Sequence, residues 1–391
     1  MSTQTYPHTV STGNPATQVQ FPFLDLKTQY AAIHGEIMAA VTRVLESQNL
    51  ILGPEVEALE QEIAAYTGAK FAIGCASGSD ALLLALMALD IGPGDEVITS
   101  PFTFGATIGS IARLGARPVF VDIDPITFNL DPAKLEAAIT PKTRALMPVH
   151  LFGLPAKMDA IMEIAQRRQL PVIEDAAQSI GSRWKGRQIG GIGDFGCFSF
   201  FPSKNLGGAG DGGMITTNNS DHAQRLRMLR AHGTRKKYVY ECVGMNSRLD
   251  ALQAAILRVK LQHLSEWTEA RRRNATRYQQ MFTERGLDKK MQLPSAGKES
   301  FHVYNQYSVR VRQRDELQAY LRHQGIPTEI YYPGALHLQP AFAYLGHREG
   351  EFPVSEQVCR DVLALPICPQ LTLDHQSAVV DAIADFYHQK N

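Results

Sequence analysis

The sequence lacks an excess of charge of either sign. Its 391 residues include 39 lysines and arginines and 39 aspartates and glutamates, which gives a formal net charge of zero. Without a net basic field, the chain has no general electrostatic attraction for nucleic acid or for an anionic lipid surface. We therefore expect no nucleic acid and no membrane among its partners.

Cysteine is scarce, and its spacing is uninformative for metals. The five cysteines are odd in number, and no two of them form a C-x-x-C motif. A disulfide framework and a zinc site both require a more regular pattern. We expect free thiols, a reducing compartment and no bound metal. The cysteines are Cys75, Cys197, Cys242, Cys359 and Cys368.

Long apolar runs are also absent. The run at residues 81–89 is too short to cross a bilayer and predicts a buried helix. Residues 1–20 are rich in Ser, Thr, Gln, Pro and Asn, with neither a charged start nor an apolar core, so they do not form a secretory signal. We expect a flexible N-terminal arm and a cytoplasmic location.

What the sequence does contain is an alternation of short β-rich runs with helical patterns. This order predicts crossover connections and a mostly parallel central sheet that is covered by helices on both faces, an α/β fold. The predicted strands cover residues 96–99, 118–121, 145–149 and 171–173, and the predicted helices cover residues 79–90, 131–139 and 158–168.

The pattern changes near residue 248, which predicts two domains. A long charged helix follows, with apolar residues at steps of three and four, and then come a predicted strand at 303–312 and a helix at 314–323. We expect a large domain over residues 21–248 and a smaller α+β domain over residues 249–391.

Ligands of such sheets bind beyond the carboxyl ends of the strands, where several polar motifs fall. Residues 75–82, Cys-Ala-Ser-Gly-Ser-Asp-Ala-Leu, lead into a helix. Its free N–H groups, with Ser79 as the expected cap, form either a phosphate site or simply a capped helix. Phe104, which follows the strand at 96–99, either stacks on a flat ring or packs in the core.

A carboxylate and an amine complete the pattern. Asp175 ends an apolar strand, where burial requires a partner such as a protonated pyridine nitrogen or a helix start. Lys204 lies in a glycine-flanked turn after the apolar residues 195–201, and burial there would lower its pKa from about 10.4 so that the amine can form a Schiff base. Gln178 is placed to bond a phenolic oxygen, and Ser199 to contact a phosphate.

These motifs, in this order, resemble the DegT/DnrJ/EryC1/StrS family of sugar aminotransferases. Members are fold type I pyridoxal phosphate enzymes that aminate nucleotide-linked keto sugars. The resemblance begins near Phe23 and covers nearly all of the chain. It is carried by residues 24–26, 52–54, 76–82, 103–104, 150–153, 174–178, 198–200, 204–207, 246–250 and 336–342.

The resemblance implies a role for each matching residue. Lys204 would be the Schiff-base lysine and proton shuttle, and Asn246 would reach the cofactor phosphate of a neighbouring subunit, so that a homodimer shares its active sites. L-Glutamate would be the amino donor, with 2-oxoglutarate released and pyridoxamine phosphate formed between half-reactions. The other implied cofactor contacts are Asp175 at the pyridine nitrogen, Gln178 at the ring hydroxyl, Phe104 stacked on the ring, and Gly78, Ser79 and Ser199 at the phosphate.

The same comparison bears on the substrate. Family members that aminate C4 of the sugar commonly carry His at the position of Gln178, whereas those that act on C3 commonly carry Gln, so we expect a UDP- or dTDP-linked 3-keto hexose or uronic acid. Lys236 and Lys237 lie in a segment that resembles the substrate loop of the family. The alternative interpretation of this segment is a solvated loop without a substrate contact. Tyr332 and His337 lie in Tyr-Pro-Gly-Ala-Leu-His, where the family usually has Tyr-Pro-x-Pro-Leu-His.

Other functions stay open at this point. The chain is alternatively a 4-keto sugar or cyclitol aminotransferase or, more remotely, a DNA-binding regulator. Lys204 argues against the dehydratase relatives, in which His replaces the Schiff-base lysine.

Overall fold

The structure, a computed structural model, describes residues 21–389. The predicted N-terminal arm, residues 1–20, lies outside the described residues. Within 21–389, none of the helices combines the length and the hydropathy that a bilayer crossing requires. The five cysteines are all free thiols.

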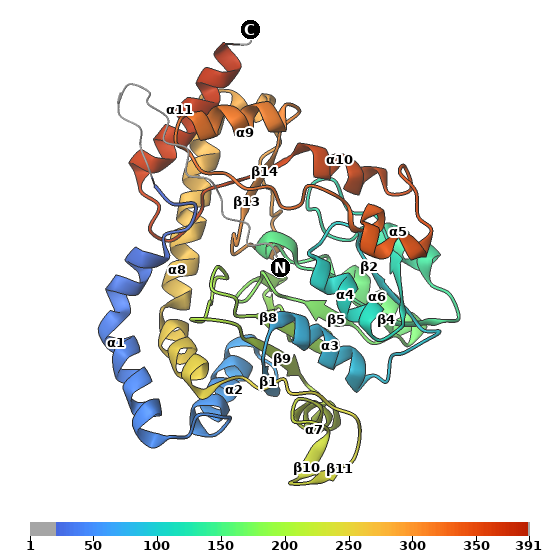
Figure 1. The fold of residues 1–391 in the computed structure, drawn as a ribbon. Coiled ribbons are helices and arrows are strands. Elements are labelled where there is room, and N and C mark those ends of the chain that lie inside the picture. The colour runs from blue at the N-terminus through green and yellow to red at the C-terminus, as the bar shows by residue number, and fades with distance from the viewer. Residues whose placement is uncertain (1–20, 390–391) are drawn as a thin grey trace, which may run out of the picture.

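The centre of the molecule is a sheet made of two groups of strands (Figure 1). One group has the order β1-β9-β8-β5 and the other the order β3-β2-β4. Parallel bridges between Leu146 and Val172 and between Val149 and Asp175 join the two groups along β5. The strands are β1 (Phe71–Cys75), β2 (Glu96–Thr99), β3 (Arg117–Phe120), β4 (Thr143–Leu146), β5 (Ile173–Asp175), β8 (Phe195–Ser199) and β9 (Gly213–Thr217).

The sheet is mostly parallel, as predicted, with β9 as the exception. β2 pairs in parallel with β3 and β4, and β5 pairs in parallel with β8, whereas β9 is antiparallel to β8 and β1. A loop without a crossover helix joins β8 to β9, so the chain reverses direction there. This reversing loop carries Lys204.

Helices cover both faces of the sheet, also as predicted. Successive strand residues alternate between two buried clusters, for example Val97 and Ile98, or Cys197 and Phe198, as side chains in a strand must. One cluster includes side chains from α2, α6 and α8, and the other includes side chains from α3, α4 and α7. The helices of this part are α1 (Leu26–Ser47), α2 (Pro54–Thr67), α3 (Gly78–Ala88), α4 (Gly105–Arg113), α5 (Pro132–Leu135), α6 (Met158–Arg168) and α7 (Ser220–Leu229).

The C-terminal part has its own core around a two-stranded antiparallel sheet, β13 (Tyr307–Arg310) with β14 (Val362–Leu365). α9 (Arg314–His323) has the predicted bounds, whereas the predicted strand at 303–312 is shorter in the structure. The other helices here are α10 (Pro353–Asp361) and α11 (Leu373–His388).

Helix α8 (Ala251–Glu284) links the two parts (Figure 1). Its first half contributes Ala254 and Leu257 to a cluster of the large sheet, and its second half contributes Tyr278 and Phe282 to the C-terminal core. The division into domains at residue 248 stays a prediction, because the helix after that point belongs to both cores.

Short elements complete the described chain. The strands are β6 (Arg183–Trp184), β7 (Arg187–Gln188), β10 (Thr234–Lys236), β11 (Val239–Tyr240) and β12 (Ser300–Phe301), and the 3₁₀ helices are η1 (Glu136–Ala138), η2 (Leu151–Gly153), η3 (Leu287–Lys289), η4 (Leu336–Leu338) and η5 (Pro340–Leu345).

Candidate active site

A cavity of about 360 Å³ lies where β5, the start of α3 and the loop after β8 meet. Residues from the C-terminal part close one side of it, among them Tyr331 and Tyr332. Eight of the predicted site residues line this cavity, and they come from positions far apart in the sequence: Gly78, Ser79, Phe104, Asp175, Gln178, Ser199, Lys204 and Tyr332.

Lys204 is half-buried in the loop between β8 and β9. Its backbone N–H donates to the Phe201 carbonyl at 2.9 Å, which forms a tight turn under the side chain. Burial lowers the pKa of the Lys204 amine to about 8, against the attraction of Asp175, which acts to raise it. At neutral pH a larger share of this amine is therefore neutral than in an ordinary lysine, as nucleophilic chemistry requires.

Asp175 is the last residue of β5 and is 4% exposed. Its Oδ2 accepts a hydrogen bond from the Thr107 hydroxyl at 2.8 Å, and its Oδ1 accepts one from the Ala177 N–H at 3.2 Å. Burial raises the pKa of Asp175, although these hydrogen bonds and Lys204 act to lower it. Within residues 21–389 no cationic nitrogen lies within 4 Å of this carboxylate.

The start of α3 is packed against the end of β8. A Cβ atom on Gly78 would lie 2.6 Å from the Cβ of Ser199, so only glycine allows this approach. The prediction that Ser79 caps the helix is wrong, because Ser77 accepts the hydrogen bond from the Asp80 N–H at 3.0 Å. Ser79 is instead exposed at the cavity, where its hydroxyl and the first N–H groups of α3 can bind an anion together.

Phe104 and Gln178 line the same cavity as Asp175. Phe104 is 60% exposed, so the interpretation that it packs in the core is wrong, and its ring lies 6.2 Å from that of Tyr332. The Gln178 amide is fixed at both ends: Oε1 accepts from the Phe152 N–H at 2.6 Å, and Nε2 donates to the Tyr332 hydroxyl at 3.1 Å. One hydrogen of Nε2 is left for a ligand, because an amide carries two.

Four predicted residues do not line this cavity. Lys236 and Lys237 are exposed on the hairpin of β10 and β11, which projects from the molecule beside α7 (Figure 1). Asn246 is exposed and lines a neighbouring hollow with Asp211, which also lines the cavity. His337 is buried, with its Nε2 at 3.1 Å from Glu356 Oε1, so the short helix η4 turns this predicted substrate contact into the interior.

A group of buried residues supports the site without having been predicted from the sequence. Glu174 is fully buried beside Asp175, and its carboxylate lies 3.1 Å from His150 Nε2. It also accepts hydrogen bonds from the N–H groups of Gly190, Ile192 and Gly193 at 2.7–2.9 Å. Burial acts to raise the pKa of Glu174, but these donors outweigh it and hold the pKa below its usual value. Such contacts have no signal in local sequence, because the partners lie 16–24 residues away.

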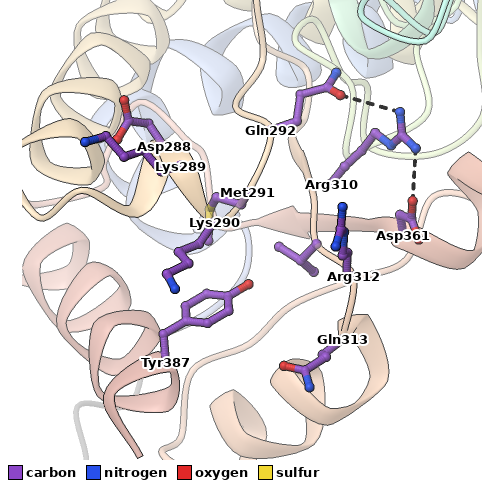
Figure 2. Close-up of a pocket in the computed structure, with 11 residues that line it drawn as sticks. Asp288, Lys289, Lys290, Met291, Gln292, Arg310, Arg312, Gln313, Asp361 and Tyr387 are labelled. Carbon is purple, nitrogen blue, oxygen red and sulfur yellow. Dashed lines mark hydrogen bonds and ion pairs between the residues drawn. The ribbon is translucent and has the colours of Figure 1, made fainter. Parts of the chain in front are cut away.

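A second cavity, of about 900 Å³, lies in the C-terminal part (Figure 2). Arg310 bonds Gln292 and pairs with Asp361 at 2.9 Å on one side of it, and Lys290 and Arg312 also line it. None of the predicted site residues lies there. The lysines of the larger cavity are exposed and Asp361 is only half-buried, unlike Lys204 and Asp175 in the smaller cavity.

The model of the DegT/DnrJ/EryC1/StrS aminotransferase family matches residues 31–384. The chain belongs to this family. The aminotransferase is 52% identical over 366 residues to the "pleiotropic regulatory protein" of Geobacillus stearothermophilus, with 94% of this chain and 98% of that one covered. It is 44% identical to the UDP-N-acetyl-3-dehydro-alpha-D-glucosamine 3-aminotransferase of Acidithiobacillus ferrooxidans, with 94% and 98% covered.

Solved structures agree with the fold. The crystal structure of Streptomyces venezuelae DesV in complex with a ketimine intermediate superposes on the aminotransferase with a TM-score of 0.91, at 46% identity and with 94% of this chain and 98% of that one covered. The predicted family and fold, a fold type I pyridoxal phosphate enzyme, are therefore confirmed, and the protein is a pyridoxal phosphate-dependent transaminase.

The residues of the smaller cavity fit this cofactor. Pyridoxal phosphate, when bound, supplies an aldehyde that condenses with amines and a ring that accepts electrons. Asp175, buried without a cationic partner among the described residues, would hold the protonated pyridine nitrogen. Lys204 would hold the aldehyde carbon, and Ser79 and the start of α3 would hold the phosphate. These individual contacts stay predictions.

Proposed function

We propose that this aminotransferase moves the amino group of L-glutamate to the C3 carbon of a nucleotide-linked 3-keto sugar. The observation that carries the chemistry is the pairing of an amine of lowered pKa, Lys204, with the buried carboxylate Asp175 in one cavity. Two observations support C3. One is the relative that aminates a 3-dehydro sugar nucleotide, and the other is Gln178, three residues after β5, at the position where family members that act on C3 commonly carry Gln.

In this proposal the protein groups act in a fixed order. The neutral amine of Lys204 would take the proton from the α-carbon of L-glutamate, and 2-oxoglutarate would be released. With the keto sugar, Lys204 would deliver a proton to C3 of the sugar. The cofactor, when bound, would carry the amino group from one substrate to the other. A positioned base of this kind contributes on the order of 10² to 10⁴ in rate.

We also propose a homodimer in which Asn246 completes the active site of the second copy. Asn246 is exposed outside its own cavity, which supports a role toward another chain. Large apolar side chains are exposed both in the cavity and in the neighbouring hollow that contains Asn246, at 60% for Phe104, 51% for Phe201 and 54% for Ile51. Burial of such side chains against a second chain would be favourable.

Subunit complementation tests the shared site. Lys204→Ala and Asn246→Ala chains are each purified, mixed, dissociated and reassociated. A hybrid dimer contains one site with both Lys204 and Asn246 if the asparagine acts across the interface, so activity should rise well above that of either variant. No gain in activity from verified hybrid dimers would contradict the shared site.

The substrate is tested in the reverse direction. Purified holoenzyme is incubated with 2-oxoglutarate and a panel of 3-amino and 4-amino sugars linked to UDP or dTDP, together with an amino cyclitol, and the glutamate formed is measured. The proposal predicts glutamate only with the 3-amino sugar nucleotides. Activity confined to 4-amino sugars or to the cyclitol would overturn the assignment of C3.

A regulatory function has less support. The word "regulatory" appears in the name of the Geobacillus stearothermophilus relative. This chain, however, has zero net charge, which gives no general attraction for DNA. Retention of the purified protein on a DNA column at physiological salt, together with no reaction toward L-glutamate, would favour the regulatory alternative.

A further inference from the structure

Lys260 is a buried lysine that the chemistry described above does not use. It lies on α8 and is 9% exposed. Within residues 21–389 no carboxylate lies within 4 Å of its ammonium group, which instead donates a hydrogen bond to the backbone carbonyl of Gly207. Gly207 follows Lys204 by three residues in the loop between β8 and β9.

A second side chain of α8 contacts the same loop. Gln253 precedes Lys260 by seven residues, which places both on one face of the helix. The Gln253 Oε1 atom accepts a hydrogen bond from the Ala209 N–H at 2.8 Å. One cationic donor and one amide acceptor thus hold two peptide groups of the loop against α8.

The loop is fixed from its other side by the C-terminal part. Asn205, next to Lys204, donates its Nδ2 to the Val303 carbonyl at 3.1 Å and accepts on Oδ1 from Asn305 Nδ2 at 2.8 Å. Lys204 therefore lies between two sets of contacts. The set from the C-terminal part is made by neutral groups, whereas the set from α8 includes the ammonium group of Lys260.

Gly207 packs directly on the backbone of the turn that carries Lys204. A Cβ atom on Gly207 would lie 2.3 Å from the Pro202 carbonyl oxygen, so the two sides of the turn are in backbone contact. The Phe200 carbonyl accepts from the Gly208 N–H at 2.8 Å and extends this contact. A displacement of Gly207 cannot be absorbed by an intervening side chain.

A lysine is a costly residue for this position. Burying an ammonium group without a carboxylate is unfavourable, and an apolar side chain of similar length would pack at less cost. Burial lowers the pKa of Lys260 to about 8, consistent with that cost. Among the residues that the structure describes, the ammonium group of Lys260 makes one hydrogen bond that compensates for this cost, the bond to Gly207.

We propose that Lys260, with Gln253, is a positioning residue that fixes the loop carrying Lys204 so that the amine of Lys204 faces Asp175. The proposal rests on the transaminase chemistry and not on the identity of the sugar. Loss of the Lys260 ammonium group would slow the proton transfer that Lys204 performs while leaving the contacts of Asp175 and Ser79 in place.

The test compares Lys260→Met with Lys142→Met in full-length holoenzyme. Methionine keeps an unbranched side chain but removes the donor, and Lys142 is an exposed lysine before β4 that serves as the control. The first readout is the single-turnover rate with L-glutamate per bound cofactor. We expect Lys260→Met to be slower by about 10- to 100-fold, since small misplacements of a catalytic group cost this much, with KM for glutamate changed by less than about threefold.

The second readout is amide hydrogen exchange of residues 200–210 in the cofactor-free full-length chain. We expect at least about tenfold faster exchange in Lys260→Met and no change in Lys142→Met, because the loop loses an anchor. Lys260→Arg, which keeps a cationic donor, should recover part of both losses. If Lys260→Met does not fold, Gln253→Met tests the same loop through Ala209, with the same two readouts.

Two results would overturn the proposal. One is a wild-type rate per bound cofactor together with wild-type exchange in residues 200–210. The other is a lower stability of Lys260→Met with an unchanged rate per bound cofactor, because that combination describes a residue that only supports the fold.

Discussion

The side-chain amide of Gln178 donates a hydrogen bond to the Tyr332 hydroxyl across 3.1 Å, and so joins residues that lie 154 positions apart. The same amide accepts from the Phe152 N–H at 2.6 Å. One glutamine therefore connects the end of β5, the segment after β4 and the C-terminal part at the wall of the active-site cavity. The cavity is complete only when both parts of the chain are folded together.

This relationship predicts unequal effects for two substitutions. Gln178→Leu leaves the buried Phe152 N–H without an acceptor and should lower the free energy of unfolding by about 1–3 kcal/mol. Tyr332→Phe removes only one hydrogen bond and should cost about 0.5–1.5 kcal/mol. Urea denaturation of the cofactor-free chains measures both. An equal or larger loss for Tyr332→Phe would contradict the arrangement.

Asp175→Asn should lower the activity without lowering the stability of the cofactor-free chain. Because burial raises the pKa of Asp175, its carboxylate is unfavourable in the cofactor-free fold at neutral pH, and the neutral amide should not lower the free energy of unfolding at pH 7. Activity should fall on the order of 10²-fold or more, as when another preorganised electrostatic contact is removed. Thermal unfolding and transaminase assays check the two statements, and a stable variant with wild-type turnover would contradict the role at the pyridine nitrogen.

Glu174→Gln should be strongly destabilising. The buried carboxylate accepts from three backbone N–H groups and contacts His150, and disrupting a buried charged network costs about 3–5 kcal/mol. Glu163→Gln, on the exposed face of α6, is the matched control and should cost less than about 1 kcal/mol.

The effect of Glu174 also depends on pH. Its folded pKa is lowered below 4.5, so its contribution is present above about pH 4.5 and is lost as the pH falls through the folded value. The difference in unfolding free energy between wild type and Glu174→Gln should therefore shrink in acid. A difference that stays constant from pH 7 down to pH 3 would be inconsistent with this ionised carboxylate.

Lys204 should give the cofactor-free chain a distinct dependence on alkaline pH. Its folded pKa of about 8 lies below the ordinary value of 10.5, so between these values the unfolded chain binds more protons than the folded chain. The free energy of unfolding of wild type should rise with pH in this window relative to Lys204→Met, and the difference should be constant below about pH 8. Lys260 is present in both proteins, so its contribution to the pH dependence cancels in the difference. Parallel curves from pH 7 to pH 10 would contradict the lowered pKa.

Much of the fold follows from local sequence, because periodicity and helix ends are local properties. The bounds of α6 and α9 match the predicted helices, and β2 matches its predicted strand. β8 and β9 were not predicted, because both are short and buried on both faces, and the direction of β9 depends on a loop. Short strands buried on both faces carry no alternation of polar and apolar residues that would reveal them.

The site was predictable where its residues share one motif and unpredictable where they meet only in three dimensions. Asp175 and Gln178 lie in one run at the end of β5, and Lys204 in one turn, so the family resemblance covers them. His337 was misplaced because its partner Glu356 comes from α10, and Thr107 was missed because its bond to Asp175 spans 68 residues. Such contacts depend on tertiary packing and not on spacing.

Absorbance spectroscopy of the purified holoenzyme tests the central claim most directly. L-Glutamate should convert the absorbance of bound pyridoxal phosphate to that of pyridoxamine phosphate, and 2-oxoglutarate should restore it, with one equivalent of keto acid formed per active site. In Lys204→Ala, both absorbance changes should be slower than in wild type by about 100-fold or more. A wild-type protein whose absorbance does not respond to glutamate, or a Lys204→Ala variant that cycles at the wild-type rate, would contradict the assignment of Lys204.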